Sequence, residues 1–160
     1  MQFITDGVTG FFSIIWTILS KRIFWSCFTI WFTAQAIKFI WYFIKFKKIN
    51  FRLLVGTGGM PSSHTAFVTG LTTTIGLLVG WNTPEFMITL GFSIVVISDA
   101  VGVRRAAGKQ ATTLNKIVED FYKNHSEELP ERLKEFLGHT PMEAAMGLLL
   151  GLVMAIMING

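Results

Sequence analysis

Cysteine and charged residues are both scarce in this chain, and each shortage excludes a class of protein. Cys27 is the single cysteine, which excludes an internal disulfide framework and a cysteine-based zinc site. Charged residues make up 15% of the sequence, whereas soluble domains carry about 25%. No cluster of carboxylates suggests magnesium, so we expect neither a metal site nor another cofactor. Hydrophobic residues make up 51% of the chain, a composition typical of a membrane protein.

The apolar residues are gathered in long blocks separated by polar connections. A membrane-spanning helix needs about 20 predominantly apolar residues. The blocks therefore predict an all-α, polytopic membrane helix bundle of about five transmembrane helices, forming a single domain over residues 1–160. The predicted spans are 3–19, 23–46, 65–81, 86–103 and 142–158. The first block lacks a basic start and a small-residue cleavage site, so we expect a retained span rather than a signal peptide.

One connection is long enough to form structure of its own. Within 113–137, apolar residues recur at helical spacing between charged ones, first around Leu114 and Phe121 and again around Leu133. This pattern predicts a short amphipathic cytoplasmic insertion lying on the membrane. It is either a structural connector or a lid over a site.

The basic residues lie on one side of the predicted topology. Of the 14 Lys and Arg residues, 11 fall in the two connections at 46–63 and 104–140 or at their edges. The positive-inside rule places this side in the cytoplasm. The net charge of +4 suits contact with anionic membrane lipids, and no motif supports nucleic-acid binding. A homodimer would cover the exposed small-residue faces of so slim a bundle.

A glycine-rich stretch precedes the third predicted span. Residues 51–63 read FRLLVGTGGMPSS, and Ser62 and Ser63 are good residues with which to begin a helix. Free amides at a helix start attract anions, and Gly59 allows the backbone to approach a phosphate closely. His64 follows at the membrane boundary. The stretch predicts a phosphate-binding helix start, although such a turn is also common without a ligand.

A second histidine begins the last span. His139 and Glu143 are four residues apart and share a helix face, so the carboxylate is able to hold the imidazole. The same face continues through Gly147 and Gly151, a small-residue stripe that allows another helix to pack closely. We therefore expect His139 to face the interior of the bundle.

Charged residues within or beside the predicted spans add to the candidate site. Lys38 and Lys45 lie seven residues apart on one helix face. Buried charges are costly in a membrane and mark function by default. Asp99 is expected to pair with Arg104, Arg105 or Lys38, and either arginine is suited to grip a phosphate. An ordinary ion pair is the structural alternative. Lys109 is a further supporting candidate.

Three long segments resemble the divergent branch of the type 2 phosphatidic acid phosphatase superfamily. They read GTGGMPSSHTAFVTGL (56–71), SDAVGVRRAAGKQATTLNKIVED (98–120) and LGHTPMEAAMGLLLG (137–151). The superfamily's first motif is matched by the spacing of Lys38 and Lys45, with Lys in place of Arg. Its second motif corresponds to 61–64. The histidine and acid of its third motif correspond to His139 and Glu143, while the arginine is displaced upstream.

The resemblance implies a metal-independent phosphatase that works through a phosphohistidine. It makes His139 the nucleophile, Glu143 its orienter and His64 the general acid. Phosphate would be held by Lys38, Lys45, Arg104 or Arg105, Ser62, Ser63 and Gly59. The implied substrate is a lipid phosphate, such as phosphatidic acid, phosphatidylglycerophosphate or an isoprenyl phosphate or pyrophosphate, at a bacterial cytoplasmic membrane. A non-catalytic lipid-phosphate binding or transport protein is the alternative function.

Overall fold

A computed structural model of the chain describes residues 17–47, 59–122, 133 and 138–160, and these residues form an all-helical bundle. The helices are α2 (Arg22–Phe46), α3 (Ser63–Leu78), α4 (Pro84–Val101), α5 (Val103–Tyr122) and α6 (Pro141–Asn159). The all-α membrane bundle expected from the sequence is confirmed. The predicted span 3–19 lies almost wholly outside the described residues.

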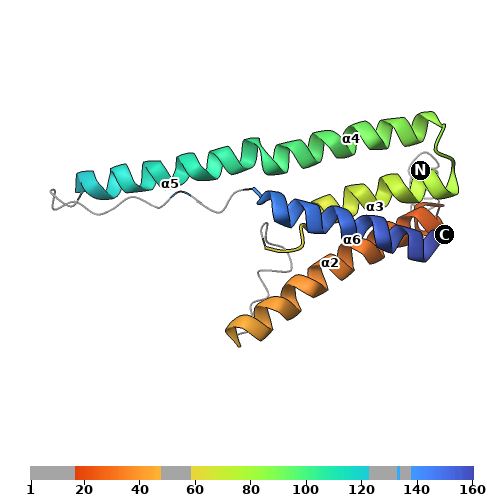
Figure 1. The fold of residues 1–160 in the computed structure, drawn as a ribbon, viewed down its shortest axis with the longest axis horizontal. Coiled ribbons are helices and arrows are strands. Elements are labelled where there is room, and N and C mark those ends of the chain that lie inside the picture. The colour runs from red at the N-terminus through yellow and green to blue at the C-terminus, as the bar shows by residue number, and fades with distance from the viewer. Residues whose placement is uncertain (1–16, 48–58, 123–132, 134–137) are drawn as a thin grey trace, which may run out of the picture.

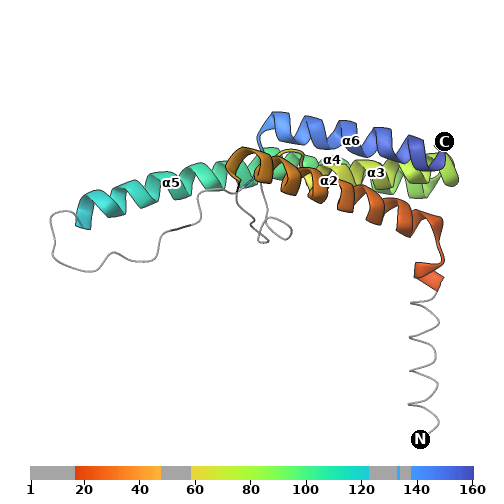
Figure 2. The same cartoon turned by 90° about the horizontal axis from the view of Figure 1, so that it is seen from below.

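Three helices of the described part are long and apolar enough to cross a membrane. They are α2, α6 and the continuous rod that α4 and α5 form over Pro84–Tyr122. Figures 1 and 2 show α5 extending this rod well beyond the other helices. The 16-residue α3 is shorter than these and packs against α2, α4 and α6, so it forms the centre of the bundle.

Small residues allow α3 and α6 to pack closely. A Cβ atom on Gly151 would collide with the backbone of Ala66, and one on Gly147 would meet the carbonyl oxygen of Ser62. The close packing confirms that the stripe Gly147–Gly151 faces another helix. Hydroxyl groups join α3 to α4, since Thr72 bonds Ser93 of α4 at 2.7 Å. Such pairs join helices without leaving a polar group unsatisfied in lipid.

The α4–α5 rod differs from the predicted arrangement. The sequence pattern placed an amphipathic insertion over 113–137, whereas the structure begins α5 at Val103, and Gly102 alone separates it from α4. Most of residues 123–137 lie outside the described part. The returning chain is held where it is described, because the Asn115 side chain bonds both backbone groups of Leu133 at 2.9 and 3.0 Å.

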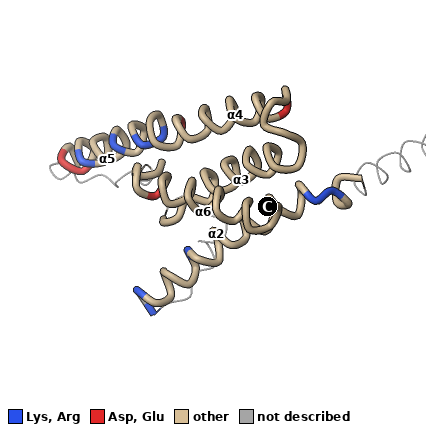
Figure 3. The backbone as a smooth tube through the Cα atoms, turned by 45° about the vertical axis from the view of Figure 1, so that its right-hand side comes forward, with Lys and Arg blue, Asp and Glu red and all other residues tan. Residues whose placement is uncertain are grey.

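Basic residues gather at three places in the described part of the chain. Figure 3 shows them along α5, at the C-terminal end of α2 and just before α2, at the opposite end of that helix. At that opposite end, Arg22 bonds the carbonyl oxygen of Ile158 at 2.6 Å, and Asn159 bonds Ser26 and Thr74. These contacts fasten α2 to the end of α6, far from the histidines.

Candidate functional site

His139 lies in the segment just before α6, and its backbone is anchored to α4. Its amide donates to the carbonyl oxygen of Ala100 at 2.9 Å, near the end of α4. Gly138 precedes it with φ +88, and a Cβ there would collide with the backbone of Arg104 and Arg105. Glycine is therefore required at 138 for both its conformation and its contact. The imidazole of His139 is buried, with 4% of its surface exposed.

Glu143 joins His139 to the start of α6. The Thr140 side chain accepts from the Glu143 amide at 3.2 Å, and the Glu143 carboxylate accepts from the Thr140 amide at 3.0 Å. This reciprocal pair is a capping box. The same carboxylate oxygen lies 3.4 Å from Nδ1 of His139. With Nδ1–H directed to Glu143, Nε2 of His139 carries the lone pair.

His64 lies opposite His139, in the first turn of α3. The Ser62 side chain begins α3 by accepting from the Thr65 amide. The Ser62 amide itself donates to the carbonyl oxygen of Glu143 at 3.0 Å, which ties the start of α3 to α6. As a result, the two imidazole rings stand with their centroids 6.0 Å apart and their planes at 49°.

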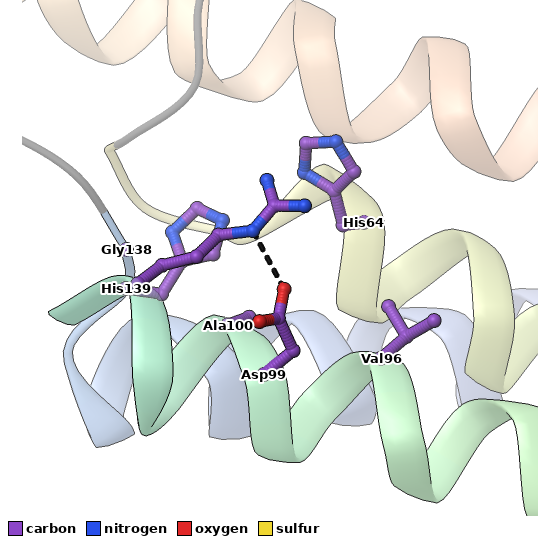
Figure 4. Close-up of a pocket in the computed structure, with 7 residues that line it drawn as sticks. His64, Val96, Asp99, Ala100, Gly138 and His139 are labelled. Atoms are coloured by element: carbon purple, nitrogen blue, oxygen red, sulfur yellow. Dashed lines mark hydrogen bonds and ion pairs between the residues drawn. The ribbon is translucent and has the colours of Figure 1, made fainter. Parts of the chain in front are cut away.

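The two rings line a small cavity together with an ion pair. The cavity encloses about 50 Å³, and its lining residues are His64, Val96, Asp99, Ala100, Arg104, Gly138 and His139. Figure 4 shows His64 and His139 on either side of it, with Asp99 below; the dashed line is the 2.6 Å bond from Nε of Arg104 to the Asp99 carboxylate. Since one water takes up roughly 30 Å³ in the liquid, the cavity suits a group of only a few heavy atoms.

The surroundings of His139 favour its neutral form. Burial lowers the pKa of His139 from its ordinary value of 6.5. The hydrogen bond and negative charge of Glu143 raise it, and the positive charges of Lys38 and Arg104 lower it. The net shift is downward, so the imidazole is uncharged near neutral pH and its lone pair is available.

Lys38 is buried beneath the start of α3. It is 4% exposed, and its ammonium group donates to the Ser63 hydroxyl at 3.0 Å. Lys38 does not line the cavity, but its charge acts on both histidines. Its contribution to the site is therefore electrostatic, exerted through the first turn of α3.

The structure brings some of the predicted site residues together and leaves others apart. His139, His64, Asp99 and Arg104 meet at the cavity. Glu143 lies behind His139, and Lys38 bonds Ser63 at the start of α3. The remaining candidates are exposed or otherwise engaged: Lys45 near the end of α2, Arg105 and Lys109 on α5, Gly59 with φ +82 before α3, and Ser62, whose amide is bonded to Glu143.

Two features of the site were not predicted from the sequence. The capping box could have been found, because Thr140 and Glu143 have the Thr-x-x-Glu spacing that begins a helix. Gly138 directly precedes the histidine, but its contact with α5 depends on tertiary packing and has no local signal. Among the described residues, no group of three or more His, Cys, Asp and Glu side chains is placed to hold a metal ion.

Fold and site together define a class: an integral membrane helix bundle with two histidines and an ion-paired arginine around a small cavity. The chain belongs to the divergent PAP2 family, whose family model matches residues 19–154. It is similar to the uncharacterized membrane protein YuiD of Bacillus subtilis (strain 168), with 40% identity over 135 residues, covering 78% of this chain and 85% of the relative. No solved structure matches the chain significantly.

Proposed function

We propose that this protein is a membrane lipid-phosphate phosphatase that hydrolyses a phosphomonoester or pyrophosphate through a phosphohistidine on His139. The observation that carries the proposal is the pair of imidazole rings, 6.0 Å apart across one cavity, with Glu143 on Nδ1 of His139. A nucleophile backed by an orienting carboxylate and faced by a second histidine is the arrangement that covalent phosphoryl transfer needs.

In the first step, Nε2 of His139 attacks phosphorus and the bond from phosphorus to the lipid oxygen breaks. His64 donates its proton to that oxygen, so the lipid leaves as an alcohol, or as a monophosphate when the substrate is a pyrophosphate. The imidazolium character that develops on His139 is stabilised by Glu143. Arg104 lines the same cavity and stabilises the negative oxygens of the phosphoryl group.

In the second step, water attacks phosphorus of the phosphohistidine and the nitrogen–phosphorus bond breaks. His64, now neutral, takes a proton from the water, and inorganic phosphate leaves. Both histidines then hold the protons with which they began. Lys38 remains behind the first turn of α3 throughout and adds positive potential without touching the cavity.

Of the two arginine candidates, Arg104 is the one the geometry favours. Both arginines are exposed on α5, but only Arg104 is among the residues that line the cavity. The proposed face of the membrane is the cytoplasmic one, because most basic residues lie in the connections at the histidine end of the bundle. Phosphatidic acid, phosphatidylglycerophosphate and isoprenyl phosphates are the candidate substrates.

The test is phosphate release by purified protein in detergent across a panel of these lipid phosphates, with and without EDTA. His139→Ala is expected to abolish release, and His64→Gln to slow it by about 10²- to 10⁴-fold. The matched control is His125→Ala, at the third histidine of the sequence, which should leave the rate unchanged. Acid-labile phosphate bound to wild-type protein would identify the intermediate.

Two results would reject the proposal. Equal release by wild type and His139→Ala would exclude the covalent mechanism, and loss of all activity with EDTA would exclude a metal-independent one. Tight binding of lipid phosphates by the wild type with no release of phosphate would instead identify a binding or transport protein.

A further inference from the structure

Helix α5 carries an apolar surface that no other described helix covers. Among the described helices it packs against α4 alone, the helix that it continues. Three apolar side chains on one side of it, Val103, Leu114 and Ile117, are between 49 and 69% exposed. A different side of α5 is engaged with the returning chain, where Asn115 bonds Leu133. Leu114 faces about 100° away from Asn115, so that contact leaves the apolar side uncovered.

The side chains on this surface recur with the spacing of a coiled-coil seam. Alternating steps of four and three residues define what is here called the heptad stripe: Val103, Ala107, Gln110, Leu114, Ile117 and Phe121. Steps of this kind keep side chains on one face, because an α-helix turns once in about 3.6 residues. Ala107 is small, so a second helix is able to approach closely at that level. The stripe therefore has the pattern by which two helices pack side by side.

The rod formed by α4 and α5 carries the heptad stripe away from the membrane. Helix α4 has 18 residues and is about 27 Å long, close to the hydrocarbon thickness of a bilayer, which is about 30 Å. The whole rod over Pro84–Tyr122 has 39 residues, and Figures 1 and 2 show α5 continuing the direction of α4. With α4 across the membrane, α5 stands in water, where an apolar stripe is stabilised by a protein partner.

Gln110 distinguishes between the partners that the stripe could take. It is exposed and lies within the stripe, between Ala107 and Leu114. Against lipid its amide would be buried without a hydrogen-bond partner, which is costly. Against a second copy in parallel register, the two Gln110 amides meet and satisfy each other, since each carries both a donor and an acceptor. A single polar residue in a seam also fixes the register of the two helices.

The charges of α5 are compatible with an identical partner. Basic residues that lie away from the stripe on the helical wheel are Arg105, Lys109 and Lys116. Of the positions that flank the stripe, Arg104 and Asp120 are charged, and Arg104 is bonded to Asp99 of its own chain. The other flanking residues are uncharged: Ala106, Ala111, Thr113 and Val118. Two parallel copies therefore meet without opposing their lysines. The small-residue face of α6 is not available instead, because α3 of the same chain occupies it.

We propose that the heptad stripe is the interface of a homodimer in which the α5 helices of two copies pack in parallel and in register. Copies that share one orientation in the membrane are related by a two-fold axis along the membrane normal, so each stripe residue meets its own counterpart. So short a stripe forms a weak pair in free solution, but a common membrane raises the effective concentration of the two helices. Arg104 lies outside the stripe, so each copy keeps its own histidine cavity, and the inference is independent of the proposed function.

Cysteine cross-linking of the full chain in lipid vesicles tests the interface. In a Cys27→Ser background, Val103→Cys and Ile117→Cys should each give a disulfide-linked dimer on mild oxidation, because like positions lie within disulfide range. The matched control is Lys116→Cys, also exposed but on another side of α5, which should stay monomeric. Equal linking of the control would overturn the inference. So would a disulfide that forms only when the Val103→Cys and Ile117→Cys chains are mixed, which is the mark of an antiparallel pair.

A second readout measures the strength of the dimer by energy transfer between labelled copies as the vesicles are diluted with lipid. Ile117→Glu places two unpaired carboxylates in the seam and should weaken the dimer by about a hundredfold or more, whereas Lys116→Glu should not. Ile117 is exposed in the single chain, so both variants should keep the circular dichroism of the wild type. Wild-type protein that is monomeric at every dilution would overturn the inference. Quenching of a fluorophore on Leu114→Cys by brominated lipid would place the stripe on the membrane instead and would also overturn it.

Discussion

The Asp99 carboxylate accepts a hydrogen bond from Nε of Arg104 at 2.6 Å, across the break between α4 and α5 at Gly102. Because Nε is engaged, the guanidinium plane is fixed, and its remaining N–H groups are left for another acceptor. Guanidinium groups bind phosphate through such parallel donors. Asp99 is thus a positioning residue for Arg104 in the proposed reaction.

We predict that Asp99→Asn lowers kcat/KM by about tenfold without unfolding the protein. The pair is substantially exposed, at 56% for Arg104 and 38% for Asp99, and exposed pairs contribute at most about 1 kcal/mol to stability. Thermal unfolding in detergent should therefore change little, and the loss should reside in phosphate binding, measured as weaker inhibition by orthovanadate.

A double-mutant cycle separates positioning from direct participation. In an Arg104→Ala background, Asp99→Asn should cost nothing further, because the arginine that Asp99 positions is gone. An additional loss in that background would mean that Asp99 acts on the substrate itself. Arg105→Ala, next in sequence and outside the cavity, is the control and should retain wild-type activity.

The pH dependence of kcat/KM should report the lowered pKa of His139. Burial depresses that pKa, so His139 stays neutral and nucleophilic until the pH falls below 6.5, and the acid limb of the profile should lie below that value. An acid limb at or above pH 6.5 would contradict this environment for the nucleophile.

Two substitutions should move this acid limb in opposite directions. Glu143→Gln removes a charge that raises the pKa of His139, so the limb should shift to still lower pH as the rate falls. Gln is able to retain the capping box, so the start of α6 should persist. Arg104→Ala removes a charge that lowers the pKa, and the limb should shift upward. Shifts of the same sign would rule out this electrostatic account.

Packing between α3 and α6 predicts a difference between two glycines. Gly151→Ala would drive a methyl group into the backbone of Ala66 and should cost about 1–3 kcal/mol of stability. Gly91 on α4 has no atom within 4 Å of the added group, so Gly91→Ala should be neutral or slightly stabilising. Thermal unfolding in detergent, followed by circular dichroism, compares the two variants. Equal melting temperatures would mean that α3 and α6 are not in close contact.

The spacing of residues in the sequence was enough to predict part of the site. His139 and Glu143 are four residues apart at a helix start, and the small residues that follow on the same face lie against α3 as expected. The choice between Arg104 and Arg105 could not be made from the sequence, because adjacent residues on a helix differ by about 100° and only the packing of α4 and α5 decides which one faces the cavity.

Other expectations depended on partners that the sequence does not disclose. The Ser62 amide was predicted to be a free donor at a helix start, but the carbonyl oxygen of Glu143 takes it. The fourth span was predicted to end at 103 and the amphipathic insertion to begin at 113, whereas α5 starts directly at Val103 and runs to Tyr122. The histidine cavity has no single linear signature, since its lining comes from α3, α4, α5 and the segment just before α6.

The anchoring of His139 on the end of α4 determines where the chain is able to gain or lose residues without disturbing the site. Its amide is held by Ala100, and Gly138 rests on the backbone of Arg104 and Arg105, so the chain leaves this junction after 105 and returns to the same place at 138. The closure of a loop depends only weakly on its length. His139 and Arg104 therefore keep their relative positions over a wide range of lengths of the segment between them, and we expect relatives to gain or lose residues in this stretch.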